Sequence, residues 1–278
     1  FLSVFQKSNV AFQNLYGGLK YQKYKLFDGS NTLIEALQNI EDVKNNDSYK
    51  GIILNLSGCN INREMLWEIR EQLKSLQKAG KKFVVYIDGG GMDLYHFASV
   101  ADKIVMDPVS AIQLPGYSAG KTYMKGTLDK LGIGFDEWRF FKYKSAMEVL
   151  SRDKSSEADK EQRQALIDDF YDLAKTDILS SRPWLASSYE DIVNNKVLIN
   201  SKDAVKLGLV DTLARYDDLE KIFEGVVNSS ISLKSLASSS KRYLPDDNLW
   251  GKKSKIAVIY AIGACAMDEG ITARRLIN

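Results

Sequence analysis

Short, almost wholly apolar runs alternate along this chain with segments whose apolar residues repeat at helical spacing, and this alternation constrains the fold more than any other feature. Residues 51–56, 83–87 and 103–107 are runs of this kind, as expected of strands that are covered on both faces. Between the first two runs, the apolar residues of 65–76 recur every three or four positions, and Gly80 can end that helix. The alternation predicts an α/β fold with a parallel sheet, flanking helices and right-handed crossovers.

The expected domain organisation follows from changes of composition along the chain. Residues 1–30 are aromatic and poorly periodic and receive no assignment, whereas residues 31–227 carry the alternating pattern of one large domain. Within that domain, residues 155–179 have the strongest amphipathic helical pattern. A serine-rich stretch over 228–254 is expected to be a linker. Residues 255–278 begin with a new apolar run, so they either complete the first domain or start a second one.

Composition and charge argue against several classes of partner and site. The 278 residues carry 38 basic and 36 acidic side chains without a dense Lys/Arg block, so nucleic acid is not an expected partner. No apolar run approaches the roughly 20 residues that span a bilayer, and no signal peptide opens the sequence, so the protein is either soluble or separated from a membrane anchor. Cys59 and Cys265 lack CxxC spacing, and His96 is the only histidine, which argues against a metal site.

Three sequence features imitate functional sites. Residues 116–122 resemble a phosphate-binding loop, but the spacing between the two glycines is one residue too short to wrap a phosphate, so no nucleotide cofactor is expected. His96 has apolar neighbours and is expected to be a packed or partly exposed helix residue rather than a member of a Ser-His-Asp triad. The glycines of 89–91 are more consistent with a plain turn than with a ligand loop.

Lys144 is the strongest candidate for a reacting group. The aromatic residues 135–141 are expected to form a strand that leads through a polar turn to a helix, which places Lys144 where the strand gives way to the helix. A helix N-terminus and the neighbouring Lys142 both disfavour a charged amine, and a neutral amine can act as a general base for a serine hydroxyl. The alternative is an ordinary surface lysine at a helix start.

Residues 141–148 resemble the Y-K-S-A-x-E motif of the signal peptide peptidase A family, also called protease IV, whose members are serine/lysine-dyad peptidases with a ClpP/crotonase-like fold. The similarity is to the amino-terminal repeat of the long, two-domain members, and it covers about residues 30–226. Further similar segments occur in the family's order at 50–54, 79–86, 95–104, 128–133 and 204–211. Residues 255–266 resemble the first strand of the second repeat, so 255–278 is expected to start a second, truncated domain.

The resemblance implies a role for one residue and leaves its partner missing. Lys144 matches the general-base lysine of the family. Met92 occupies the position of the nucleophilic serine, and a thioether cannot attack a carbonyl. Residues 55–59 do not reproduce the N-S-P-G-G loop that helps to shape the family's substrate groove. The nucleophile is therefore expected in a second domain, and the 278-residue chain alone is expected to be inactive.

The resemblance also implies a biological setting. It implies that apolar, cleaved signal peptides are degraded by a homo-oligomer at the outer (periplasmic or extracytoplasmic) face of the bacterial inner membrane, with a membrane anchor that is not present in this chain. It implies no cofactor and no metal. Two alternatives remain open. One is a non-catalytic assembly or interaction domain of the same fold, which Met92 favours; the other is a crotonase-type acyl-CoA enzyme, for which no carboxylate is convincingly placed.

Overall fold

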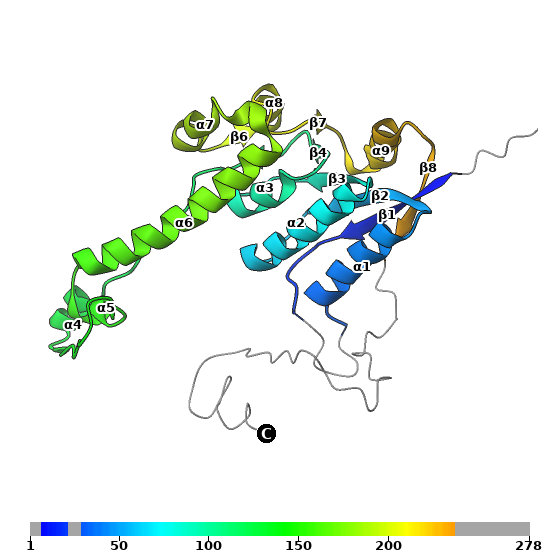
Figure 1. Cartoon of the computed structure of the whole chain (residues 1–278). Coiled ribbons are helices and arrows are strands. Elements are labelled where there is room, and N and C mark those ends of the chain that lie inside the picture. Colours follow the sequence, from blue (N-terminus) through cyan, green and yellow to red (C-terminus); the bar gives the residue numbers. More distant parts are fainter. Residues whose placement is uncertain (1–6, 22–28, 237–278) are drawn as a thin grey trace, which may run out of the picture. The chain divides into compact units, whose positions relative to one another are not determined.

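A parallel sheet forms the centre of the fold (Figure 1). The computed structural model describes residues 7–21 and 29–236, all of which belong to one compact unit. In these residues, every neighbouring pair of strands in the six-stranded sheet is parallel. In sheet order the strands are β7 (Thr212–Leu213), β4 (Lys103–Met106), β3 (Lys82–Ile87), β2 (Tyr49–Asn55), β1 (Ser8–Asn14) and β8 (Ile231–Ser235). The predicted α/β fold with a parallel sheet is confirmed, while residues 255–278 lie outside the described part of the chain.

The two strands at one side of the sheet come from segments in which the sequence predicted none. β1 lies in the unassigned residues 1–30, and β8 lies in the expected linker 228–254. β1 pairs with β2 on one side and with β8 on the other, and its Val10 and Ala11 are fully buried. In β8, Ile231 is buried while the other side chains are partly or fully exposed. An edge strand of this kind tolerates a serine-rich sequence, which is why composition alone suggested a linker.

Helices cover the two faces of the sheet unequally. One face is covered by α1 (Leu33–Asn45), α2 (Arg63–Lys78) and α3 (Met92–Ala98), and the other by α9 (Leu219–Val227). Side chains alternate along β2, so Ile52 and Leu54 belong to the larger core and Ile53 to the core beneath α9. This burial on both faces explains the continuous apolar run that identified the strand.

The remaining elements lie outside these layers. They are α4 (Lys125–Lys130), α5 (Glu148–Ser151), α6 (Glu157–Ser181), α7 (Tyr189–Asn195), α8 (Ser201–Lys206), the short 3₁₀ helices η1 (Pro183–Leu185) and η2 (Tyr216–Asp218), and the antiparallel strands β5 (Ala111–Ile112) and β6 (Ile199–Asn200). α6 is the long helix that the sequence predicted over 155–179.

α6 runs away from the sheet and carries α4 and α5 at its outer end (Figure 1). Much of its predicted apolar face is exposed or only partly buried: Leu166 is 52% exposed and Leu173 is 49% exposed. Nearer the sheet, Ala174 and Ile178 are buried. Apolar burial therefore stabilises α6 mainly at its sheet end.

Two buried arginines fix that end. Arg182 follows the last turn of α6 and donates hydrogen bonds of 2.9 and 2.8 Å to the carboxylate of Asp211, and further bonds to two backbone carbonyls that precede β4. Arg70 of α2 lies 3.3 Å from Asp177 Oδ2 and donates to the Asp177 carbonyl at 3.0 Å. Since a buried charge is tolerated only when it is paired, these contacts restrict α6 to one position on the body of the fold.

Replacing Arg182 with methionine should destabilise the fold strongly. The change removes the arginine partner of the Asp211 carboxylate, which keeps only the Ile104 backbone N–H among the described residues, and it removes the donor to two backbone carbonyls. We therefore expect the free energy of unfolding to fall by about 3 kcal/mol. Denaturant unfolding of the purified variant measures the effect. Lys206→Ala is the control, because Lys206 is 77% exposed and its ion pair with Asp203 is a surface contact. Equal losses in the two variants would contradict the assignment.

Candidate functional site

Residues 139–148, named the lysine loop from here on, lie at the outer end of α6, where they lead into α5 (Figure 1). The predicted strand over 135–141 is wrong, because these residues form no strand and α5 begins only at Glu148. The described residues at the outer end of α6 include no sheet with which an aromatic strand could pair, and Trp138 and Phe140 are 86% and 80% exposed. Lys144 therefore stands in an irregular turn before the helix and not at a strand-to-helix junction.

Lys144 presents its amine to solvent. The side chain is exposed, and the backbone N–H donates to the Phe141 carbonyl at 3.2 Å. Within residues 7–21 and 29–236, Lys144 Nζ forms no hydrogen bond and no ion pair. The amine is therefore open to a group that approaches from outside the described residues.

Both neighbours of Lys144 are bound to the beginning of α6. The Tyr143 hydroxyl donates to Glu161 Oε1 at 2.9 Å. On the other side, the Ser145 hydroxyl donates to Asp159 Oδ1 at 2.6 Å. The loop is thus held immediately before and immediately after a residue whose own side chain is unbound.

Asp159 is a buried acid on which several contacts converge. It is only 2% exposed, and its carboxylate oxygens lie 3.1 Å from Lys121 Nζ and 3.1 Å from Arg163 Nε. Burial alone would raise the pKa of Asp159, but hydrogen bonds from Ser145 and Lys121 outweigh burial and hold that pKa well below its usual range. Asp159 is consequently ionised at neutral pH.

Glu148 closes the lysine loop against the start of α6. It is fully buried, and it accepts hydrogen bonds from the Ser156 backbone N–H at 3.0 Å and from Arg139. Ser156 also caps α6, because its hydroxyl accepts from the Asp159 N–H at 3.1 Å. Burial opposes ionisation of Glu148, but the bonds from Ser156 and Arg139 lower its pKa. The motif residues that flank Lys144 therefore serve to hold the loop.

Met92, which occupies the expected nucleophile position, belongs to a different part of the fold. It is the first residue of α3, which packs against α2 and α6, whereas α5 packs against α4 at the outer end of α6 (Figure 1). The Met92 side chain is 4% exposed and lies in the larger apolar core. The described residues thus do not bring Met92 and Lys144 together.

His96 is packed within α3 and has an acidic partner. Its Nε2 lies 2.8 Å from Asp177 Oδ2, and the Arg70 guanidinium lies 3.3 Å from the same oxygen. Burial lowers the pKa of the His96 imidazole, and the Arg70 charge adds to this effect against the opposing hydrogen bond to Asp177. In the described part of the chain no hydroxyl or thiol hydrogen-bonds to the His96 ring, so these residues form no Ser-His-Asp triad.

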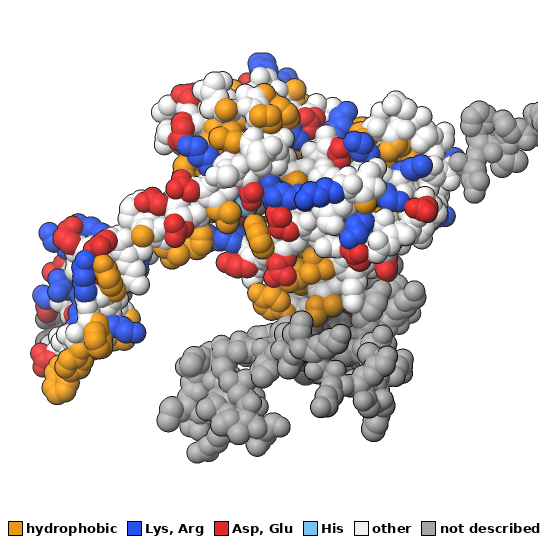
Figure 2. Space-filling model, viewed as in Figure 1, with side chains coloured by type: hydrophobic (Ala, Val, Ile, Leu, Met, Phe, Trp, Pro, Cys, Tyr) orange, Lys and Arg blue, Asp and Glu red, His pale blue; other side chains and the backbone are white. Residues whose placement is uncertain are grey.

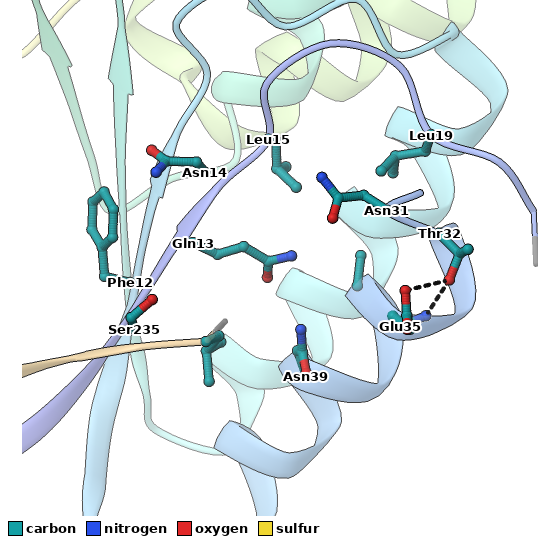
Figure 3. Close-up of a pocket in the computed structure, with 12 residues that line it drawn as sticks. Phe12, Gln13, Asn14, Leu15, Leu19, Asn31, Thr32, Glu35, Asn39 and Ser235 are labelled. Atoms are coloured by element: carbon teal, nitrogen blue, oxygen red, sulfur yellow. Dashed lines mark hydrogen bonds between the residues drawn. The ribbon is translucent and has the colours of Figure 1, made fainter. Parts of the chain in front are cut away.

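A pocket of about 230 Å³ lies between β1, the end of β8 and the start of α1 (Figure 3). Side-chain amides of Gln13, Asn31 and Asn39 line it together with apolar residues. Glu35, the carboxylate in its lining, accepts a hydrogen bond of 3.0 Å from the Thr32 hydroxyl. None of the candidate residues of the sequence lines this pocket, so it is separate from the lysine loop.

The remaining findings concern metal, phosphate, membrane and the Cys59 thiol. In residues 7–21 and 29–236, no group of three or more His, Cys, Asp or Glu side chains could hold a metal ion. Lys121 of the phosphate-loop imitation is bound to Asp159 and to the Ser145 carbonyl. None of the described helices has the length and apolar character required to cross a bilayer. Cys59 is a free, half-buried thiol, and burial raises its pKa.

Sequence reasoning missed Asp159 and Lys121 as parts of the site. A local pattern could have indicated Asp159, because Ser156 and Asp159 have the spacing of a helix-capping pair at the start of the long helix. Lys121 had no such local pattern, since its partner Asp159 is 38 positions away.

Comparison with known proteins gives a family match, two relatives and one solved structure. Residues 75–228 match the profile of peptidase family S49. The chain is 24% identical over 273 residues to the chloroplastic serine protease SPPA of Arabidopsis thaliana, covering 95% of this chain and 40% of that protein. It is 31% identical over 152 residues to Protease 4 of Haemophilus influenzae, covering 53% of this chain and 23% of that protein. The chain thus spans less than half the length of these relatives.

A solved structure is similar as well. A mutant of the 1510-N membrane-bound stomatin-specific protease superposes with a TM-score of 0.50 at 12% sequence identity, covering 84% of this chain and 100% of that one. At this identity the similarity concerns the fold.

Acidification from about pH 7.5 to about pH 5.5 should destabilise the protein through His96. Because its folded-state pKa lies below the ordinary value of 6.5, the unfolded chain binds more protons, and stability present at neutral pH is lost as the pH falls through 6.5. Asp177 titrates below this window, because its pKa is lowered from 3.8. Denaturant unfolding at both pH values should show a smaller loss for His96→Gln than for the unchanged protein. Equal losses would assign the dependence to other groups.

Proposed function

This chain belongs to peptidase family S49, whose profile matches more than half of it, and on that premise we propose that it is the lysine-bearing part of a serine/lysine-dyad endopeptidase. The observation that carries the proposal is the lysine loop. Its motif residues bind the start of α6 on both sides of Lys144, while the amine itself is unbound within the described residues. Such an arrangement suits a base whose reaction partner comes from elsewhere.

The proposed reaction begins with a proton transfer. The neutral amine of Lys144 takes the proton of a serine hydroxyl supplied by a second domain, and the serine oxygen attacks the peptide carbonyl. Backbone N–H groups near that carbonyl stabilise the tetrahedral oxyanion. The ammonium of Lys144 then returns the proton to the leaving amine, and water, deprotonated by the same lysine, hydrolyses the acyl-enzyme. No cofactor or metal takes part in these steps.

Exposed apolar side chains beside Lys144 support this role. Trp138, Phe140, Phe141 and Met147 are between 50% and 86% exposed. Figure 2 shows apolar side chains gathered at the outer end of α6 among charged ones. A domain or neighbouring subunit that covered them would also remove water from Lys144, and desolvation favours the neutral amine that a general base requires. We therefore include in the proposal a nucleophile-bearing domain and a homo-oligomer that complete the site.

The proposed substrates are apolar peptides, in particular cleaved signal peptides that bind in an extended conformation. The proposed location is the outer face of the bacterial inner membrane, with the anchor outside this chain. Family membership supports the serine peptidase chemistry, and the apolar surface around Lys144 is compatible with apolar substrates.

A second candidate function rests on Met92. Its buried thioether replaces the nucleophile, so the same fold could serve as a non-catalytic assembly or interaction domain. In that case Lys144 would be an ordinary exposed lysine, and its removal would leave any activity of the whole protein unchanged.

Lys144→Ala should abolish peptidase activity in the chain extended to its natural carboxyl end. Loss of the general base should lower kcat for peptide-ester hydrolysis by about 10²- to 10⁴-fold. Lys142→Ala is the matched control, because Lys142 lies in the same loop but is bound to Glu161 at 2.7 Å. If activity survives Lys144→Ala, the assembly-domain alternative is favoured.

The 278-residue chain by itself should not turn over peptide esters, because its nucleophile position holds Met92. Hydrolysis assays on the purified fragment, with and without a serine-directed fluorophosphonate, measure this. Steady turnover that the inhibitor stops would reveal a nucleophile inside the fragment.

A further inference from the structure

We propose that Asp159 is the positioning residue of the lysine loop: from the first turn of α6 it fixes Ser145, and through Ser145 the backbone that carries Lys144. The inference rests on the proposed function, because it assigns a further residue to the same site. Asp159 lies outside the 141–148 motif and accepts the hydrogen bond that Ser145 of the motif donates.

The need for a positioning group follows from Lys144 itself. Its side chain is exposed and makes no hydrogen bond or ion pair with the described residues. A lysine side chain of this kind gains no direction from its own contacts, so the place of its amine depends on the backbone and on what binds the adjacent residues.

Asp159 and Lys121 form hydrogen bonds with two groups of Ser145, its hydroxyl and its carbonyl. Asp159 Oδ1 accepts from the Ser145 hydroxyl at 2.6 Å, and Lys121 Nζ donates to the Ser145 carbonyl at 3.0 Å. Lys121 is in turn paired with Asp159 at 3.1 Å. Asp159 therefore controls both contacts, directly through the hydroxyl and indirectly through the lysine that binds the carbonyl.

The environment makes these contacts strong. Asp159 is 2% exposed and Ser145 is 8% exposed, so water competes little for either group. Asp159 also stands in the first turn of α6, where the helix dipole favours a negative charge, and its N–H is bound by the Ser156 hydroxyl at 3.1 Å. The hydrogen bond to Ser156 thereby fixes the backbone that carries the Asp159 carboxylate.

The other side of the loop provides a natural comparison. Glu161 binds Tyr143 at 2.9 Å and Lys142 at 2.7 Å, but the Lys142 and Glu161 side chains are 59% and 57% exposed. Exposed contacts of this kind contribute little, because water and salt screen them. Of the two contacts made by the residues directly beside Lys144, the Asp159 contact is the buried one, so we assign the position of Lys144 to it.

The test uses the chain extended to its natural carboxyl end. Asp159→Asn and the milder Ser145→Ala should each lower kcat for peptide-ester hydrolysis about 10- to 100-fold with KM changed less than about twofold, as expected when a base is displaced. Glu161→Gln is the matched control and should change kcat less than about twofold. Asp159→Asn combined with Lys144→Ala should be no slower than Lys144→Ala alone, because Asp159 acts through that lysine.

A second measurement needs no nucleophile. In the 278-residue chain, Asp159→Asn should accelerate amide hydrogen exchange in residues 140–147 and leave the central strands β2 and β3 unchanged. Unchanged exchange in the loop, or faster exchange in the central strands as well, would overturn the positioning role.

The two levels of the proposal fail differently. Activity that survives Lys144→Ala overturns the proposed function, and the inference with it. Activity that is lost in Lys144→Ala but retained at the unchanged kcat in Asp159→Asn and Ser145→Ala overturns the inference alone.

Discussion

Two buried arginine–carboxylate contacts decide where the lysine loop lies. Arg70 and Arg182 hold the sheet end of α6, and over the rest of its length the helix buries few side chains. A helix of 25 residues is about 38 Å long, so the position of its first turn follows from the stiffness of the helix and from the anchor at its far end. A small tilt at the arginines would be amplified at Lys144. Arg70 and Arg182 thus help to set the position of Lys144, although they lie at the other end of α6.

At the outer end of α6, the residues that bind the loop to the helix stand next to the residue proposed as the base. Tyr143, Ser145 and Glu148 each form a hydrogen bond with a residue at the start of α6. Among the polar side chains of the loop, that of Lys144 alone is unbound within the described residues. These side-chain contacts explain why the loop needs no regular secondary structure. Its backbone is fixed by side chains that bind a helix, so the strand expected before it is unnecessary.

The sequence predicted those parts of the fold whose apolar residues form continuous runs or recur at helical spacing. β2, β3 and β4 are covered on both faces and leave continuous apolar runs, and α6 repeats its apolar residues regularly over many turns. β8 was missed because an edge strand needs only one buried side chain, Ile231, among serines. The aromatic run 135–141 was misread because an exposed surface and a buried strand can share one composition. The motif located Lys144. The contacts of Asp159 with Ser145 and Lys121 join positions far apart in the sequence, so no sequence periodicity indicates them.

The turn before Met92 shows why shape alone cannot identify a nucleophile. Gly89 and Gly90 have φ values of 126° and 140°, which only glycine adopts readily, and a Cβ on Gly89 would meet the Ala111 carbonyl oxygen at 2.9 Å. Gly90 is paired with Ile112 of β5, and its missing Cβ leaves room for Leu94. These packing contacts are sufficient to preserve a sharp turn at the start of α3 whether or not a reactive side chain follows. Under the proposed function, the reacting serine comes from a partner that reaches the outer end of α6, where the exposed Trp138 and Phe140 provide a surface for contact.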